Sequence, residues 1–111
     1  RTDVGDGGSG GATATFQALA MGPPAPNPAQ GGTRIWYGVP AGRVGAALDL
    51  AIFDLSGRRV RTLEHGIAGA GRHSVAWDLR DASGAPSGPG VYFARLATGP
   101  EVCTRKVVVV R

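Results

Sequence analysis

The sequence is poor in cysteine, in aromatic residues and in long apolar runs. Cys103 is the only cysteine, so no internal disulfide can form. No run approaches the roughly 18 consecutive apolar residues that span a bilayer as a helix. No segment of useful length shows the helical repeat of apolar residues. We therefore expect no disulfide framework, no membrane span and no helical fold.

The polar start of the sequence, Arg1-Thr2-Asp3, lacks the basic and then apolar segment of an export signal. If the protein is exported, we expect that signal to lie on a longer precursor. Residues 1–11 contain five glycines and two aspartates with almost no apolar side chain. Such a segment buries too little surface to offset the entropy of ordering it, so we predict a flexible glycine-rich linker over residues 1–11.

The remainder, residues 12–111, has the composition of one small β-rich domain. A chain of 111 residues can form one modest core and is too short for two. Its 19 glycines and 8 prolines are many for a globular chain, while hydrophobic residues keep an ordinary share of 42%. We expect a single core and many turns between short strands.

The clearest structural signal is a hairpin over residues 48–63. Apolar residues alternate with polar or small ones over residues 48–52, as a strand with one buried face requires. The Asp-Leu-Ser-Gly sequence at residues 54–57 is typical of a turn, because Asp and Ser bond nearby backbone and Gly accepts a positive φ. A lone hairpin is only marginally stable, so other strands have to cover it.

Alternation also predicts the other strands. We expect them over residues 12–21, 33–39, 58–64, 72–78, 91–96 and 102–110, with the first arm of the hairpin starting near Val44. In the first strand, one register buries Phe16 and Leu19. The other buries Ala18 and Ala20, and both stay open.

Turns and the strand from residue 72 complete the pattern. Flexible or turn-forming segments are expected over residues 65–71, 78–90 and 98–101, and Val75 and Trp77 are expected inside. Six or seven strands separated in this way indicate an all-β fold, an antiparallel sandwich of aligned sheets.

Several phrases of the sequence occur together, in this order, in one known family. They cover residues 27–28, 33–40, 52–63, 70–78, 89–96 and 104–111. In this order they resemble the C-terminal sorting domains of the type IX secretion system. They also resemble the immunoglobulin-like domain of the flagellar hook-capping protein, which shares the Asp-x-x-Gly-Arg turn and the Gly-x-x-x-x-x-Trp-Asp strand. The resemblance runs from Pro26 to the end of the sequence.

This resemblance implies an immunoglobulin-like antiparallel β-sandwich of about seven strands. It implies a position at the C-terminus of a secreted protein that an outer-membrane export machine recognises and that some members lose during surface attachment. It implies neither catalysis nor a cofactor. Leu79 is a departure, because it stands where Trp-Asp is usually followed by Gly, and the segment at residues 87–90 is another.

His65, His73 and Cys103 are the candidates for metal binding or nucleophilic catalysis. Only Glu64 stands near a histidine as a further ligand, and on a strand it points the opposite way from His65. No third group accompanies a Cys-His pair. We interpret all three as strand residues and predict no catalytic, metal or cofactor site.

Two further groups of side chains have both a functional and a structural interpretation. Asp78, Asp81 and Ser83 could supply oxygens to calcium, but turn side chains that bond their own backbone explain the same residues, and we favour that interpretation. A sugar platform could form if several of the larger aromatic side chains were exposed together, although a protein with seven aromatics needs most of them in its core. The candidates are Trp36, Trp77, Tyr92 and Phe93.

The candidate partner-binding residues lie in two basic segments. Arg58, Arg59 and Arg61 could grip a phosphate or a carboxylate-rich surface, or they could protect a strand edge from pairing with other molecules. The final strand could add to the sheet of a partner by main-chain hydrogen bonds, because it lies at the chain end. Its residues are Thr104, Arg105, Lys106, Val107, Val108, Val109, Val110 and Arg111.

We therefore predict a non-enzymatic C-terminal sorting, anchoring or assembly module of a secreted or cell-surface bacterial protein, acting on protein partners by surface and β-edge recognition. One alternative is a subunit of an extracellular filament or hook-like assembly. The other is a carbohydrate-binding module of a secreted hydrolase. The net charge of +4 would favour anionic partners such as lipopolysaccharide, and we do not predict nucleic-acid binding.

Overall fold

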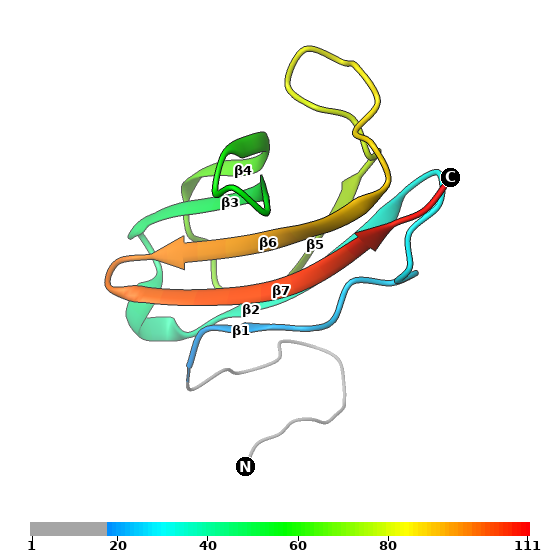
Figure 1. Ribbon diagram of the computed structural model, residues 1–111. Coiled ribbons are helices and arrows are strands. Elements are labelled where there is room, and N and C mark those ends of the chain that lie inside the picture. The colour runs from blue at the N-terminus through cyan, green and yellow to red at the C-terminus, as the bar shows by residue number, and fades with distance from the viewer. Residues whose placement is uncertain (1–17) are drawn as a thin grey trace.

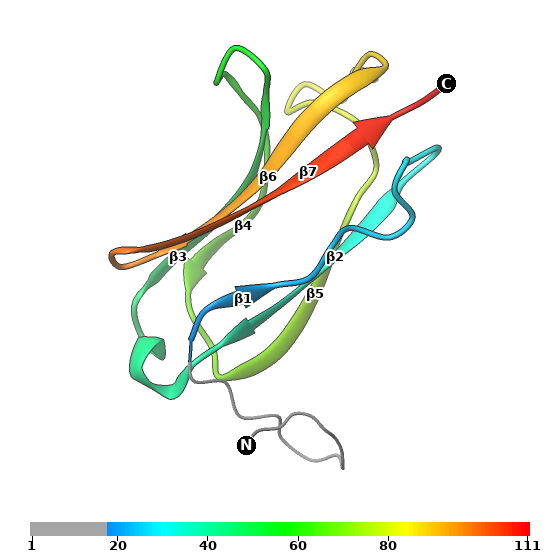
Figure 2. The same cartoon turned by 60° about the horizontal axis from the view of Figure 1, so that its bottom comes forward.

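The computed structural model describes residues 18–111 as two antiparallel sheets packed face to face (Figures 1 and 2). The three-stranded sheet has the order β1-β2-β5 and consists of β1 (Ala20–Met21), β2 (Thr33–Val39) and β5 (Gly71–Trp77). The four-stranded sheet has the order β4-β3-β6-β7 and consists of β3 (Ala47–Asp54), β4 (Arg59–Ile67), β6 (Gly90–Thr98) and β7 (Glu101–Val109). A short 3-10 helix, η1 (Ala41–Arg43), lies between β2 and β3. The predicted all-β sandwich of about seven strands is confirmed, whereas the predicted linker at residues 1–11 lies outside the described residues.

The core lies between the two sheets and is built from alternate residues of the strands. In β2, Ile35, Tyr37 and Val39 are buried while Arg34 and Trp36 face outward. The buried face predicted for residues 48–52 of β3 is confirmed in the same way. The further buried side chains include Leu48, Leu50, Ile52, Trp77, Leu79, Ala94, Leu96, Val107 and Val109.

The open question about the first strand is answered by burial. Leu19 and Met21 are buried, whereas Ala18 and Ala20 are exposed. The strand therefore uses the register that places Leu19 in the core, since it buries the larger side chains. Phe16 lies outside the described residues.

Two sequence predictions about the hairpin of β3 and β4 were wrong. Residues 65–67 were expected in a flexible connection, but β4 continues to Ile67 and pairs with the beginning of β3. The first arm begins at Ala47 and not near Val44, because the residues before it form η1 and the turn that follows it. The backbone groups of residues 65–67 form hydrogen bonds with β3, and these bonds offset the flexibility of Gly66.

The turn between β6 and β7 is also shorter than predicted. Thr98 and Glu101 pair with each other, so only Gly99 and Pro100 lie between the strands. Gly99 has a φ of 56°, and two-residue hairpin loops favour glycine where φ is positive. The strands consequently extend to the very end of the sandwich, and β7 covers its full length.

Several connections between strands meet at one end of the sandwich. The β3–β4 turn, the start of β6 and the end of β7 meet there, because Asp54 pairs with Tyr92 and Gly90 pairs with Val109. Figure 2 shows these connections together with the C-terminus at the top of the view. The loop between β5 and β6 lies at the same end.

The core predicts a clear contrast between two residues of one hairpin. Ile52 has no exposed surface, so we expect Ile52→Ala to lower the free energy of unfolding by about 2–5 kcal/mol. Leu55, in the adjoining turn, is 70% exposed, and Leu55→Ala should change it by less than about 0.5 kcal/mol. Urea unfolding measures both, and similar losses in the two variants would contradict the described hairpin.

Candidate functional site

The turn between β3 and β4 is held by one carboxylate oxygen. Oδ1 of Asp54 accepts hydrogen bonds from the Ser56 amide at 2.9 Å, the Ser56 hydroxyl at 2.6 Å and the Arg58 amide at 3.0 Å. Gly57 completes the turn with a φ of 86°. The Ser56 hydroxyl bond, followed by the Arg58 amide bond, lowers the pKa of Asp54. The side chain therefore serves the turn, as predicted from the sequence.

The same Asp-x-Ser-Gly turn occurs a second time, in the loop between β5 and β6. Oδ1 of Asp81 accepts from the Ser83 amide at 2.9 Å, the Ser83 hydroxyl at 2.6 Å and the Ala85 amide at 3.0 Å. Gly84 has a φ of 90°. The turn interpretation of this loop is thus confirmed. Within residues 18–111, no three His, Cys, Asp or Glu side chains gather closely enough to hold a metal ion.

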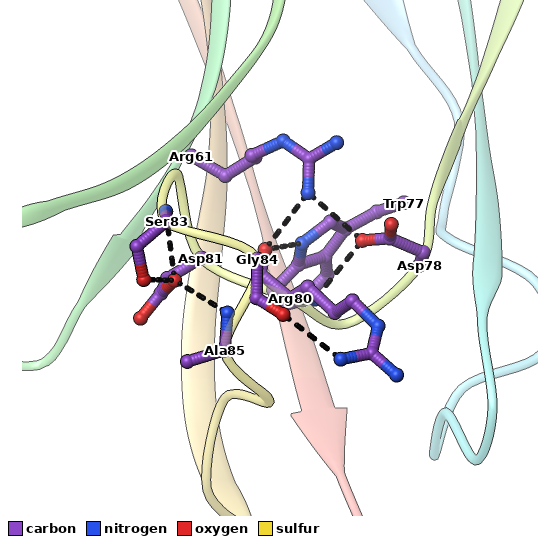
Figure 3. A network of polar contacts seen from close by, with 8 residues as sticks. All are labelled: Arg61, Trp77, Asp78, Arg80, Asp81, Ser83, Gly84 and Ala85. Atoms are coloured by element: carbon purple, nitrogen blue, oxygen red, sulfur yellow. Dashed lines mark hydrogen bonds and ion pairs between the residues drawn. The ribbon is translucent and has the colours of Figure 1, made fainter.

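The loop between β5 and β6 is tied to the four-stranded sheet by Arg61 of β4 (Figure 3). Nη1 of Arg61 donates to Oδ1 of Asp78 at 2.9 Å and to the carbonyl of Arg80 at 3.1 Å. The indole N–H of Trp77 donates to the same carbonyl at 3.0 Å. Leu79 between them is buried and has a φ of 63°. Burial of its side chain compensates for a conformation that leucine adopts reluctantly.

The three arginines predicted to bind a partner do not form one free cluster. Arg59 makes two hydrogen bonds to Asp49, at 3.1 and 2.9 Å, and its guanidinium lies 5.1 Å from the centre of the Phe53 ring. Arg61 is held by the loop described above. Arg58 reaches Asp54 at 3.3 Å, but 80% of its side chain is exposed. A partner-binding role for all three would compete with these internal ion pairs, and it stays a prediction.

The predicted final strand is β7, an edge strand of the four-stranded sheet. Its side chains alternate in burial: Val107 and Val109 are in the core, Val108 is half-buried, and Thr104, Arg105, Lys106, Val110 and Arg111 are exposed. Nε of Arg105 nevertheless donates to the carbonyl of Met21 in β1, at 2.7 Å. Arg105 thus helps to close the sandwich between the two sheets. Recognition of β7 by its side chains would depend on the exposed residues.

The last part of the β7 edge is already occupied by residues 27–29. The Asn27 side chain acts like a peptide group, because its Oδ1 accepts from the Val108 amide at 2.9 Å and its Nδ2 donates to the Lys106 carbonyl at 3.1 Å. Ala29 exchanges two further bonds, with the Val108 carbonyl and the Val110 amide. Apart from the Asn-Pro pair itself, no sequence pattern predicted this contact.

The first part of the β7 edge is different. Odd-numbered residues from Glu101 bond to β6, so the amides and carbonyls of the even-numbered residues point away from the sheet. No backbone group of residues 18–111 bonds those of Val102 and Thr104, or the amide of Lys106. The open part of the edge is therefore residues 102–106.

Cys103 lies on β7 and His65 on β4, the two edge strands of the four-stranded sheet, whereas His73 lies on β5 of the other sheet. Nε2 of His73 lies 2.9 Å from the Gly69 carbonyl, so Nε2 carries the hydrogen, and the ring stacks on Tyr37. The Cys103 thiol points to the Leu19 carbonyl on the other side of the sandwich. Burial, followed by the charge of Glu101, raises the pKa of the Cys103 thiol. The structure therefore does not combine these residues into a nucleophile and base.

The four candidate aromatic side chains do not form the paired platform that a carbohydrate-binding module would need. Trp77 is buried, with Tyr92 packed edge-on against it. Trp36 is 39% exposed on the outer face of the three-stranded sheet. Phe93 faces outward from the four-stranded sheet, so it lies on the opposite side of the molecule.

These features match a known domain type. A family model described as the FlgD Ig-like domain matches residues 30–99, which is more than half of the chain. The chain belongs to this family. The matched residues include β2 to β6, with both Asp-x-Ser-Gly turns, and they end before β7 begins.

Two solved structures are similar to this chain. Dimeric latent PorU from Porphyromonas gingivalis matches with a TM-score of 0.61 and 24% identity, over 86% of this chain and 10% of PorU. PorZ, a surface component of the type IX secretion system of the same bacterium, matches with a TM-score of 0.49 and 23% identity, over 84% of this chain and 11% of PorZ. At such identity the PorU similarity establishes the fold alone. No curated protein matches the sequence.

A search of residues 18–111 for a helix of membrane-spanning length and apolarity finds none. The surfaces of this FlgD Ig-like domain are strand edges, sheet faces and turns held by hydrogen bonds. Its charged side chains are mostly engaged with one another or with backbone groups.

The Asp49–Arg59 pair predicts a change of stability with pH. The Arg59 hydrogen bond, above all, holds the pKa of Asp49 below its usual 3.8. Such a carboxylate stabilises the fold at neutral pH, and this contribution is lost as the pH falls below 3.8 through the lowered pKa. Asp49→Asn should therefore cost up to about 1 kcal/mol at neutral pH and flatten the acid-side decline.

Unfolding by urea at a series of pH values measures this effect. Glu64→Gln is the matched control, because Glu64 is exposed and forms no ion pair with another described residue. An unchanged pH dependence in Asp49→Asn would contradict the stabilising role of the pair.

Proposed function

We propose that this domain is a non-catalytic recognition module that sorts, anchors or assembles an exported bacterial protein at the cell surface. The observation that carries the proposal is the last strand, β7, which lies at a sheet edge. Among the described residues, the outward-pointing amides and carbonyls of Val102 and Thr104, and the amide of Lys106, have no main-chain partner. Its membership of the FlgD Ig-like family and its resemblance to type IX sorting domains favour the same role.

Recognition would occur by the addition of a strand. An extended segment of a partner protein can bond to an open sheet edge through its main chain, and neighbouring side chains then provide selectivity. On β7, Val102, Thr104 and Lys106 would flank such a segment, and all three are exposed. Because residues 27–29 already bond to the last part of the β7 edge, the added strand would be limited to the first part.

A non-catalytic role accords with how the reactive side chains are used. Asp54 and Asp81 each hold a turn, His73 packs on Tyr37, and Cys103 faces the edge of β1. These groups serve the fold, so they are poorly placed to act on a substrate. The domain would contribute binding to a larger exported protein.

A reporter fusion tests the sorting role. The whole chain should be fused to the C-terminus of a periplasmic reporter, because Leu19 and Met21 belong to the core and a fusion starting at Asn27 would lack them. In a cell with a type IX exporter, we expect the reporter at the cell surface, measured by protease accessibility. Retention in the periplasm, with the domain folded, would refute sorting.

A proline at the edge tests the strand-addition mechanism. Thr104→Pro removes an amide that points away from the sheet, and edge strands tolerate proline there. We expect surface delivery to fall about tenfold or more, as loss of a main-chain hydrogen bond predicts. Thr104→Val keeps the amide and should be delivered normally. Circular dichroism melting confirms folding, and normal delivery of folded Thr104→Pro would reject the mechanism.

Assembly into a filament or hook-like structure is the second candidate, favoured by the FlgD Ig-like family itself. Here the open edge of β7 would pair with a neighbouring subunit. Light scattering over a range of protein concentrations separates the two candidates: growth with concentration supports assembly, and a constant monomer argues against it.

A further inference from the structure

The outer face of the three-stranded sheet carries positive charge that the rest of the domain does not balance. Of the six carboxylates in residues 18–111, none lies on β1, β2 or β5. Four of them already pair with arginines on other elements, in the pairs Arg43–Glu101, Arg58–Asp54, Arg59–Asp49 and Arg61–Asp78. The arginines of this sheet, Arg34 and Arg72, have no such partner among the described residues.

Both arginines lean toward the same pair of residues. Trp36 of β2 lies directly opposite Ser74 of β5. Nη1 of Arg34 donates to the Ser74 hydroxyl at 3.0 Å, and Cζ of Arg72 lies 4.6 Å from the centre of the Trp36 ring. Two guanidinium groups thus converge on the Trp36–Ser74 pair from its two sides.

This convergence favours an anionic ligand. Two like charges on neighbouring strands of one face raise the local positive potential, and a carboxylate bound at the Trp36–Ser74 pair would accept charge-assisted hydrogen bonds from them. Among residues 18–111, each guanidinium makes only one contact with a side chain here, so most of its five N–H groups have no partner within that part of the chain. Trp36 adds an aromatic surface of which 39% is exposed.

The surroundings of Trp36 favour a sugar over a peptide. The outward-facing neighbours of the pair on these strands are small, namely Ala20, Gly38 and Ala76, and both alanines are exposed. The strand β2 lies between β1 and β5, and its main chain is therefore engaged on both sides. A peptide on this face would find no edge to pair with, whereas a sugar ring needs only an aromatic surface and polar contacts.

We propose that Arg34, Trp36, Ser74 and Arg72 form a binding site for an acidic polysaccharide. The indole stacks against a sugar ring, and the two guanidinium groups bind its carboxylate. This site differs from the neutral sugar platform considered above, because one aromatic side chain and two charges replace a pair of aromatic rings. It lies on the three-stranded sheet, away from the open edge of β7.

Fluorescence titration of the full chain tests the site. Trp77 is buried, so binding at the face should be reported by Trp36. We expect a saturable change with polygalacturonate and none with dextran, its neutral counterpart. Replacing both arginines, as Arg34→Gln with Arg72→Gln, should weaken polygalacturonate binding about tenfold or more. Trp36→Ala, followed by calorimetry, should weaken it as well.

Arg95→Gln is the matched control, since Arg95 is exposed on the outer face of the other sheet and carries the same charge. It should change binding by less than about twofold. An equal loss of affinity in Arg95→Gln would mean that binding depends only on net charge, and it would overturn the site. A failure of the unchanged chain to bind polygalacturonate would overturn it as well. Equal binding of poly-glutamate through the same arginines would identify an acidic peptide instead. None of these measurements involves an exporter, so they are independent of the sorting role.

Discussion

The fold depends on burying alternate side chains of both sheets in one shared layer. Ile35 and Val39 from one sheet and Leu50, Ile52 and Leu96 from the other have almost no exposed surface. Each strand can satisfy this layer with every second residue. The remaining residues face solvent or a neighbouring loop, and the domain carries its polar chemistry on them.

Most of this polar chemistry holds the domain itself together. Carboxylates of β3 and of the loop after β5 bond to arginines of β4 or to the backbone of their own turns. Arg61 joins two elements distant in the sequence, and Arg105 joins the two sheets. The basic composition therefore overstates the charge that is free to meet a partner.

Two surfaces remain for interaction, and they differ in kind. The open part of β7 offers main-chain groups, which read the shape of an extended strand more than its sequence. The outer face of the three-stranded sheet offers side chains over a fully bonded backbone, which read charge and ring shape. A single small domain can thus hold a protein by its edge and a different type of ligand by its face.

Local sequence patterns were enough to predict most of the strands and turns, because alternation and turn chemistry are local properties of the chain. The Asp-Leu-Ser-Gly turn and the buried face of β3 followed directly from them. It takes the packing of the strands to explain that β4 continues through Gly66, that Asn27 occupies the end of β7, and that Arg34 and Arg72 converge on the Trp36–Ser74 pair. Each of these depends on which strands become neighbours, and residues far apart in a chain carry no local signal of that pairing.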